Sequence, residues 1–201
     1  MGIWSNLLAS LGLIKRRVSI ILVGLDNSGK TTLLEHNFKE YDIHSTSNRS
    51  IQNPGDAPKL ASIDIVPTIG FKADQFQISR SKLQITCFDM SGQGKYRDLW
   101  EHFYTNELDA IIFVIDASDH QRICVVRDEF EGMLKHPAIQ SKRIPILLFA
   151  NKMDLEAGMT VAEISTALGL ESIREHNWHI CALYCQGVHQ GLEWLADELT
   201  R

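Results

Sequence analysis

Residues Gly24–Thr31 have the types and the spacing needed to hold a polyphosphate. They read Gly-Leu-Asp-Asn-Ser-Gly-Lys-Thr and fit the pattern G-x-x-x-x-G-K-[ST] in full. Glycines let successive backbone N–H groups turn toward phosphate oxygens, and the first turn of a following helix adds a favourable dipole. Lys30 is expected to reach the β- and γ-phosphates, and the Thr31 hydroxyl to ligate Mg²⁺. The candidate phosphate contacts are Gly24, Asp26, Asn27, Ser28, Gly29, Lys30, Thr31 and Thr32.

The segments on either side of this loop support that interpretation. An apolar run typical of a strand, residues 18–23, precedes the loop, and a stretch typical of a helix begins at Lys30. The alternative is a glycine-rich turn with an incidental lysine, and the strand–loop–helix context argues against it.

A second pattern, N-K-x-D at Asn151–Asp154, predicts which base is bound. It follows an apolar run over residues 144–150. The Asp154 carboxylate can accept both the ring N–H and the exocyclic amino group of guanine, a donor pair that adenine lacks on that edge. Asn151 would contact the other polar edge of the base and tie loops together, and the Lys152 stem would cover the ring. A strand-end turn with an aspartate cap is the structural alternative.

Three further segments could complete the site. Asp89 ends an apolar run and would hold Mg²⁺ through a water, while the Gly92 N–H could meet the γ-phosphate and Gln93 could orient the attacking water. The Thr68 hydroxyl would join Thr31 and Asp89 around Mg²⁺ when a γ-phosphate is present. A threonine in such a Pro/Gly loop is usually structural, and the order of the other motifs is what favours ligation. Near the end of the chain, Cys181 and Ala182 follow the last apolar run, and the Ala182 N–H could bind the guanine carbonyl oxygen.

Length and composition exclude several classes of protein. The 201 residues suffice for one domain with a sizeable core, and 44% of them are apolar. A net charge of −5 argues against a nucleic-acid binder. The four scattered cysteines imply neither a zinc knuckle nor a disulfide framework, which favours a reducing cytosolic setting. We also expect no transmembrane run, no signal peptide and no C-terminal prenylation box.

Strand-like and helix-like stretches alternate along the chain, which predicts an α/β fold. The expected architecture is a six-stranded, mainly parallel sheet with helices on both faces. Such sheets bind ligands at the carboxyl ends of their strands, where all the motifs above fall. The expected strands are 18–23, 72–79, 83–89, 109–115, 144–150 and 177–181, and the expected helices are 30–39, 94–104, 121–135, 160–168 and 189–199.

These motifs together resemble the small GTPases of the Ras superfamily, and within it the Arf/Arf-like branch. The runs Pro67–Phe71 and Leu99–Tyr104 look like that branch rather than Ras or Rab. The resemblance implies a P-loop GTPase domain over residues 18–201, GTP/GDP and Mg²⁺ as ligands, and strands 72–79 and 83–89 that shift register between nucleotide states. It also implies an aromatic effector patch of Phe71, Phe88 and Phe103, for which plain core packing is the alternative, strongest for Phe88.

Within the branch, the chain resembles the ciliary type linked to Bardet–Biedl syndrome, in Asp89–Arg97, in residues 136–155 and in Trp178–Ala182. The resemblance implies a monomeric switch that recruits a BBSome-like coat to membranes in ciliary protein transport, in the cytoplasm and at the ciliary base and membrane. An exchange factor and a GTPase-activating protein would serve it. No motif arginine suggests an arginine supplied in cis, so we expect slow intrinsic hydrolysis that depends on the activating partner.

The N-terminal residues 1–17 are expected to form an amphipathic helix and a basic linker. Apolar residues at positions 3, 4, 7, 8 and 11 make one stripe, and Lys15, Arg16 and Arg17 follow it. This pattern is typical of a helix that lies reversibly in a membrane surface, with contact through residues 3–17. Packing of the stripe on the domain is the alternative. Asn6 stands where the myristoylation pattern at Gly2 requires Ser or Thr.

Residues 39–63 form a polar stretch that the resemblance does not cover. Its serine, asparagine, proline and glycine content predicts a solvated insertion, although a specific contact surface is possible. Because it precedes Thr68, the insertion also motivates an alternative function, a nucleotide-occupied scaffold that barely cycles. A phosphate-loop kinase is a second alternative, and Asp154 argues against it.

Overall fold

The computed structural model describes residues 16–38, 68, 70–78, 81–155, 158–183 and 187–201. Residues 1–15 of the predicted N-terminal helix and linker, and the insertion at 39–63, lie outside these ranges and stay predictions. Arg16 and Arg17, which were expected in the basic linker, are instead the first two residues of β1. In the described part, no helix is long and apolar enough to span a membrane.

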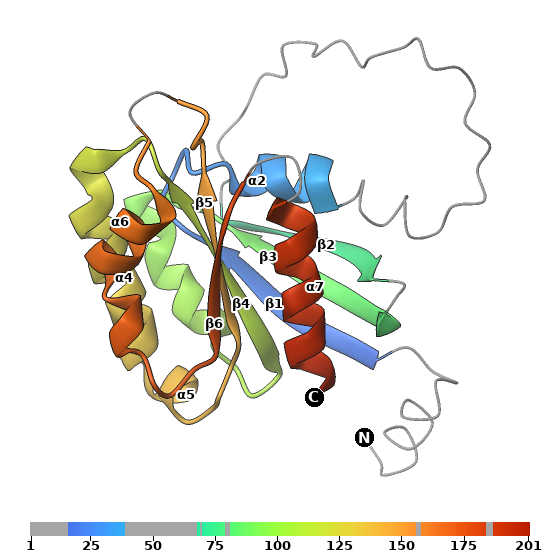
Figure 1. Cartoon of the computed structure of the whole chain (residues 1–201). Helices are drawn as coiled ribbons and strands as arrows, with labels where there is room; N and C mark the ends of the chain where they lie inside the picture. The colour runs from blue at the N-terminus through green and yellow to red at the C-terminus, as the bar shows by residue number, and fades with distance from the viewer. Residues whose placement is uncertain (1–15, 39–67, 69, 79–80, 156–157, 184–186) are drawn as a thin grey trace, which may run out of the picture.

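A six-stranded sheet forms the centre of the domain, as predicted (Figure 1). The strand order is β2-β3-β1-β4-β5-β6; β2 pairs with β3 in antiparallel fashion and all other pairs are parallel. The strands are β1 (Arg16–Val23), β2 (Phe71–Ile78), β3 (Leu83–Met90), β4 (Leu108–Asp116), β5 (Ile146–Asn151) and β6 (Trp178–Ala182).

Helices cover both faces of this sheet (Figure 1). The α-helices are α2 (Lys30–Thr32), α4 (Ile123–Lys135), α5 (Pro137–Gln140), α6 (Val161–Leu168) and α7 (Gly187–Thr200). A π-helical stretch, η1 (Leu33–Phe38), continues α2, and the 3₁₀ segments are η3 (Gly94–Phe103), η4 (His120–Arg122) and η5 (Leu170–Ser172). The expected helix at 94–104 is therefore a 3₁₀ helix, and α5 and η5 were not expected.

Side-chain alternation along the strands divides the core into two layers. On β1, Ile21 and Val23 pack toward η3, α4, α5 and α6, whereas Ile20 and Leu22 pack toward η1 and α7. Successive residues of a strand point to opposite faces, so one apolar run serves both layers. The sheet is thereby fixed from both sides, and the loops at the carboxyl ends of its parallel strands share one edge.

Candidate functional site

The predicted phosphate loop connects the end of β1 to α2 and is shaped by residues with positive φ. These are Gly24 (φ 140), Asn27 (φ 63) and Gly29 (φ 95). A Cβ at Gly29 would lie 2.2 Å from Nδ2 of Asn151. Glycine is therefore required there by both the backbone conformation and the neighbouring amide.

Lys30 is buried inside this loop, with 6% of its surface exposed. Its Nζ donates hydrogen bonds to the carbonyl oxygens of Gly24 (3.0 Å) and Leu25 (2.8 Å). Burial lowers the pKa of Lys30 to about 8, although the carboxylates of Asp89 and Asp26 oppose the shift. An anion beside this ammonium would stabilise its charged form in place of the water that burial excludes.

Three oxygens predicted to surround Mg²⁺ converge beside the loop. The Thr31 hydroxyl donates to Oδ2 of Asp89 (2.6 Å), and Oγ1 of Thr31 lies 3.0 Å from Oγ1 of Thr68. Oδ1 of Asp89 is buried and has no hydrogen-bond partner among the described residues. Burial raises the pKa of Asp89, against the effects of Thr31 and Lys30. A buried carboxylate oxygen in need of a partner, next to two hydroxyls, fits a hard cation such as Mg²⁺ or a water bound to it.

A cavity of about 310 Å³ opens between the phosphate loop, the end of β3 and the end of β5. The predicted site residues that line it are Asp26, Asn27, Gly29, Lys30, Thr31, Thr32, Thr68, Gly92, Gln93, Asn151 and Lys152.

The other predicted site residues lie behind or beside this cavity. Gly24, Ser28 and Asp89 stand directly behind its wall. Asp154 is exposed in the turn after β5. The Cys181 side chain is buried against α7, which leaves only its backbone for ligand contact, and Ala182 ends β6.

Asn151 and Lys152 join the base-recognition turn to the rest of the site. The Asn151 amide donates to the carbonyl oxygen of Ser28 (2.8 Å), which ties this turn to the phosphate loop as predicted. Nζ of Lys152 lies 2.8 Å from Oδ2 of Asp116 at the end of β4. Lys152 has a positive φ of 61°, which few non-glycine residues adopt. The ion pair therefore holds the lysine stem in place.

Asp116 was not predicted as a site residue. It is 8% exposed and also accepts hydrogen bonds from the backbone N–H and the hydroxyl of Ser118. Burial alone would raise the pKa of Asp116, but the bonds from Lys152 and Ser118 outweigh it and leave the pKa lowered. The sequence signal was an aspartate at the carboxyl end of an apolar strand, with a serine two residues later.

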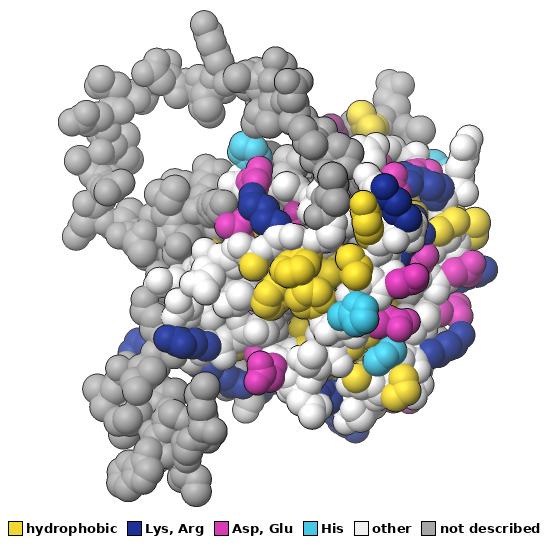
Figure 2. All heavy atoms as spheres, turned by 180° about the vertical axis from the view of Figure 1, so that it is seen from behind, with side chains coloured by type: hydrophobic (Ala, Val, Ile, Leu, Met, Phe, Trp, Pro, Cys, Tyr) yellow, Lys and Arg dark blue, Asp and Glu magenta, His cyan; other side chains and the backbone are white. Residues whose placement is uncertain are grey.

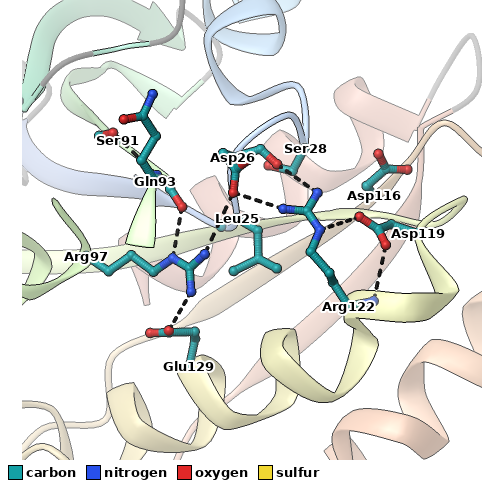
Figure 3. A network of polar contacts seen from close by, with 12 residues as sticks. Leu25, Asp26, Ser28, Ser91, Gln93, Arg97, Asp116, Asp119, Arg122 and Glu129 are labelled. Atoms are coloured by element: carbon teal, nitrogen blue, oxygen red, sulfur yellow. Dashed lines mark hydrogen bonds and ion pairs between the residues drawn. The ribbon is translucent and has the colours of Figure 1, made fainter. Parts of the chain in front are cut away.

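Two arginines that were also not predicted contact Asp26 from either side (Figure 3). Arg122 donates to Oδ1 of Asp26 (2.9 Å), to the Asp26 carbonyl oxygen (3.3 Å) and to Asp119 (2.6 Å). Arg97 donates to the carbonyl oxygen of Gly92 (2.9 Å) and to Glu129 (2.7 Å). Each guanidinium therefore has carboxylate partners in addition to Asp26.

Gly92 and Gln93, predicted to meet the γ-phosphate and the attacking water, lie between β3 and η3. We call this segment the second switch, and the segment around Thr68 the first switch. The backbone N–H of Asp26 donates to the carbonyl oxygen of Gly92 (3.1 Å). A Cβ at Gly92 would come within 2.3 Å of the Asp26 nitrogen, so only glycine allows this approach. Gln93 lines the cavity and its backbone N–H faces the Ser91 hydroxyl at 3.4 Å.

Phe71, Phe88 and Phe103 form one aromatic cluster on β2, β3 and η3. The ring centroids of Phe71 and Phe103 are 4.9 Å apart and those of Phe88 and Phe103 are 5.1 Å apart. Phe71 is 51% exposed, while the other two are partly buried against the core. Hydrophobic side chains gather on the face that Figure 2 shows, close to charged and histidine side chains. The cluster is thus both a core edge and an accessible apolar surface.

Known proteins resemble this chain over nearly its whole length. The model of the ADP-ribosylation factor family matches residues 4–53 and 57–199. ADP-ribosylation factor-like protein 6 of Danio rerio is 44% identical over 202 residues, which cover 99% of this chain and 97% of that protein. The protein of that name from Caenorhabditis elegans is 38% identical over 204 residues, with 100% and 96% covered.

A solved structure is also similar. It is the Arl6 (BBS3) small GTPase of Trypanosoma brucei with the bound nucleotide analogue GppNp. It superimposes with a TM-score of 0.73 at 35% identity and covers 92% of this chain and 98% of that one. The family model, the relatives and the solved structure all point to the class of protein that the phosphate loop and the base-recognition turn predict. The chain therefore belongs to the ADP-ribosylation factor family and is a small GTPase of the Arf-like type.

Proposed function

We propose that this GTPase is a Mg²⁺-dependent switch that, in its GTP form, recruits a BBSome-like coat to membranes for ciliary protein transport. The observation that carries the switch is the contact of Thr68 with Thr31, because it joins the segment before β2 to the phosphate loop. The coat is proposed from the 44% identity with ADP-ribosylation factor-like protein 6 of Danio rerio over nearly the full length of both proteins. The cytoplasm, the ciliary base and the ciliary membrane are the proposed locations.

The residues divide the work of binding and hydrolysis. Lys30 and the backbone of the phosphate loop would hold the phosphates. Thr31, Thr68 and Asp89 would hold Mg²⁺, which would neutralise part of the phosphate charge. Gln93, on the cavity wall, orients the attacking water. When the γ-phosphate is lost, Thr68 would lose the interaction that keeps it beside Thr31, and the first switch would be released.

The aromatic cluster of Phe71, Phe88 and Phe103 is the proposed effector surface. Phe71 follows Thr68 by three residues, so we expect a movement of Thr68 to shift this exposed ring as well. An accessible aromatic surface beside polar side chains is typical of a protein interface. The N-terminal residues 3–17 would add the reversible membrane contact.

An activating protein and an exchange factor complete the proposed cycle. Arg97 and Arg122 are already paired with carboxylates, so we expect neither to stabilise the charge of a γ-phosphate during hydrolysis. This arrangement supports the proposal of slow intrinsic hydrolysis that an arginine from a partner accelerates roughly 10³–10⁵-fold.

A paired pull-down from an extract of ciliated cells tests the proposal. One column carries Gln93→Leu loaded with GTP, and the other carries Thr31→Asn loaded with GDP. Retention of BBSome subunits on the GTP column alone is the expected result. Equal retention on both columns, or none, would reject GTP-dependent coat recruitment and favour a scaffold that does not cycle. Phe71→Ser in the Gln93→Leu background is a matched control that leaves the nucleotide site intact and should lose the coat.

Removing Mg²⁺ is expected to speed the release of bound GDP by roughly tenfold or more, a loss of about 1.4 kcal/mol of binding free energy. The reason is that Thr31 and Asp89 would then face the phosphates without a cation between them. Release of a fluorescent GDP analogue with and without EDTA measures the effect. In Asp89→Asn the difference between the two conditions should shrink. An equal release rate in the wild type with and without EDTA would contradict the magnesium site.

Asp116→Asn is expected to weaken the binding of GDP and GTP alike by about tenfold, because Lys152 loses a charged partner. Asparagine keeps the acceptor that Ser118 uses, so the end of β4 stays folded. Titration with a fluorescent nucleotide measures the affinity, and Asp197→Asn, an exposed position on α7, is the control for the charge change. Unchanged affinity would show that the ion pair is not needed to hold Lys152.

A further inference from the structure

We propose that Arg97 is a positioning residue of the second switch, which holds the Gly92–Gln93 peptide against the phosphate loop and so sets the preference for GTP over GDP. This inference rests on the proposed GTP-dependent switch. In this proposal the second switch is anchored, through Arg97, to Glu129 on α4. That helix contributes no residue to the cavity described above.

Arg97 joins three parts of the molecule. Its Nε donates to the carbonyl oxygen of Gly92 (2.9 Å), its Nη1 donates to Oε1 of Glu129 on α4 (2.7 Å), and its Nη2 lies 3.7 Å from Oδ1 of Asp26 in the phosphate loop. Figure 3 shows the Arg97 guanidinium pointing toward Glu129 on one side and Asp26 on the other. The side chain is only 15% exposed, so these bonds are partly shielded from water.

The contact with Gly92 fixes more than one atom. The Gly92 carbonyl oxygen accepts from both the Arg97 guanidinium and the Asp26 backbone N–H, so both of its lone pairs are used. That carbonyl and the N–H of Gln93 belong to the same planar peptide. Holding the Gly92 carbonyl oxygen therefore fixes the orientation of this peptide plane, including the N–H of Gln93. It also keeps Gly92 in its close approach to Asp26.

Arg122 does not duplicate this contact. It binds Asp26 and Asp119, and none of its recorded bonds reaches Gly92. Asp26 can therefore keep one arginine when the other is removed, and the phosphate loop stays supported. The link from α4 to the second switch, however, is carried by Arg97 through Glu129. Loss of Arg97 should disturb the γ-phosphate side of the cavity and spare the part that holds GDP.

The test compares two nucleotides on the full chain. Wild type and Arg97→Ala are titrated with GDP and with GppNp, a GTP analogue that is not hydrolysed, and single-turnover GTP hydrolysis is followed for both. Arg97→Ala should bind GDP within about twofold of wild type and GppNp about tenfold to a hundredfold more weakly, the range for a lost hydrogen bond to a charged group. Hydrolysis at saturating GTP should slow by a similar factor.

Two further variants separate positioning from charge and from folding. Arg127→Ala removes an arginine from the same helix that holds Glu129, but this side chain faces Glu131 and Asp128 and should behave as wild type. Glu129→Gln keeps the shape of the anchor and weakens its charge, so it should shift the GppNp/GDP ratio in the same direction by a smaller factor. It also serves as the test if Arg97→Ala fails to fold.

An unchanged GppNp/GDP ratio in both Arg97→Ala and Glu129→Gln would overturn the inference, as would an equal loss of both nucleotides, which would mark a structural contact only. These outcomes differ from failure of the switch itself. If wild type binds GDP and GppNp but recruits no coat, the proposed function fails while the ratio still reports on Arg97.

Discussion

Lys30→Met is expected to weaken the binding of both GDP and GTP on the order of 10² to 10⁴-fold. The ammonium supplies the charge that the phosphate loop offers to a polyphosphate, and two or more charge-assisted hydrogen bonds of about 1.5–3 kcal/mol each would be lost. Methionine fills a similar volume, so the loop keeps its packing. The buried ammonium is itself costly, as its lowered pKa shows, and the unfolding temperature should change little. Titration with a fluorescent nucleotide, alongside thermal unfolding, measures both quantities.

Lys135→Met is the matched control for that experiment. Lys135 is exposed on α4 and pairs with Glu131 one turn earlier, so its loss should affect neither nucleotide. If Lys30→Met bound GDP within a few-fold of wild type while remaining folded, the loop would not be the phosphate site, and the assignment of the cavity would have to be abandoned.

Asp154→Asn is expected to change which base the protein accepts. An asparagine amide can donate to the C2 carbonyl oxygen of xanthine, whereas guanine carries an amino group at that position and would face a second donor. GTP affinity should fall roughly 10²-fold or more and XTP affinity should rise, since a donor that faces a donor once the base has covered the turn costs on the order of 1–3 kcal/mol for each unpaired group. Competition of GTP and XTP for a bound fluorescent nucleotide reads out the exchange.

The base exchange has a direct control in Asp128→Asn, an exposed aspartate on α4 that should leave GTP preference intact. A variant that lost GTP without gaining XTP would show that Asp154 supports the turn after β5 rather than reading the base. Retained GTP preference in Asp154→Asn would move guanine recognition elsewhere along the cavity.

The sequence was most informative where a function depends on consecutive residues. The phosphate loop, the Asn151–Asp154 turn and the strands that precede them could be predicted because each is a local pattern with one physical purpose. Asn151 was predicted to tie loops together, and it does so through its hydrogen bond to Ser28 in the phosphate loop. The six-stranded, mainly parallel sheet followed from the alternation of strands and helices, whereas the order of the strands in it was not predicted.

What could not be predicted depends on pairs that meet only in three dimensions. Lys152 forms an ion pair with Asp116 of the neighbouring strand, and Arg97 forms one with Glu129 on another helix. No sequence spacing predicts either pair. The 3₁₀ character of η3 was missed for another reason: apolar residues at three- and four-residue intervals suit both helix types, and the sequence does not reveal which hydrogen bonds form.

The central position of β1 has a consequence for biosynthesis. This strand is the first of the sheet to be synthesised, yet its partners β3 and β4 come much later; the Ser19 N–H, for example, bonds to Asp109, 90 residues further on. At ribosomal speeds of about 5–20 residues per second, β1 waits roughly 5–20 s for its neighbours. The apolar run of residues 18–23 lacks its sheet neighbours during that interval, so we expect the nascent chain to need protection from aggregation. Bound nucleotide can assist folding only after most of the domain has been made.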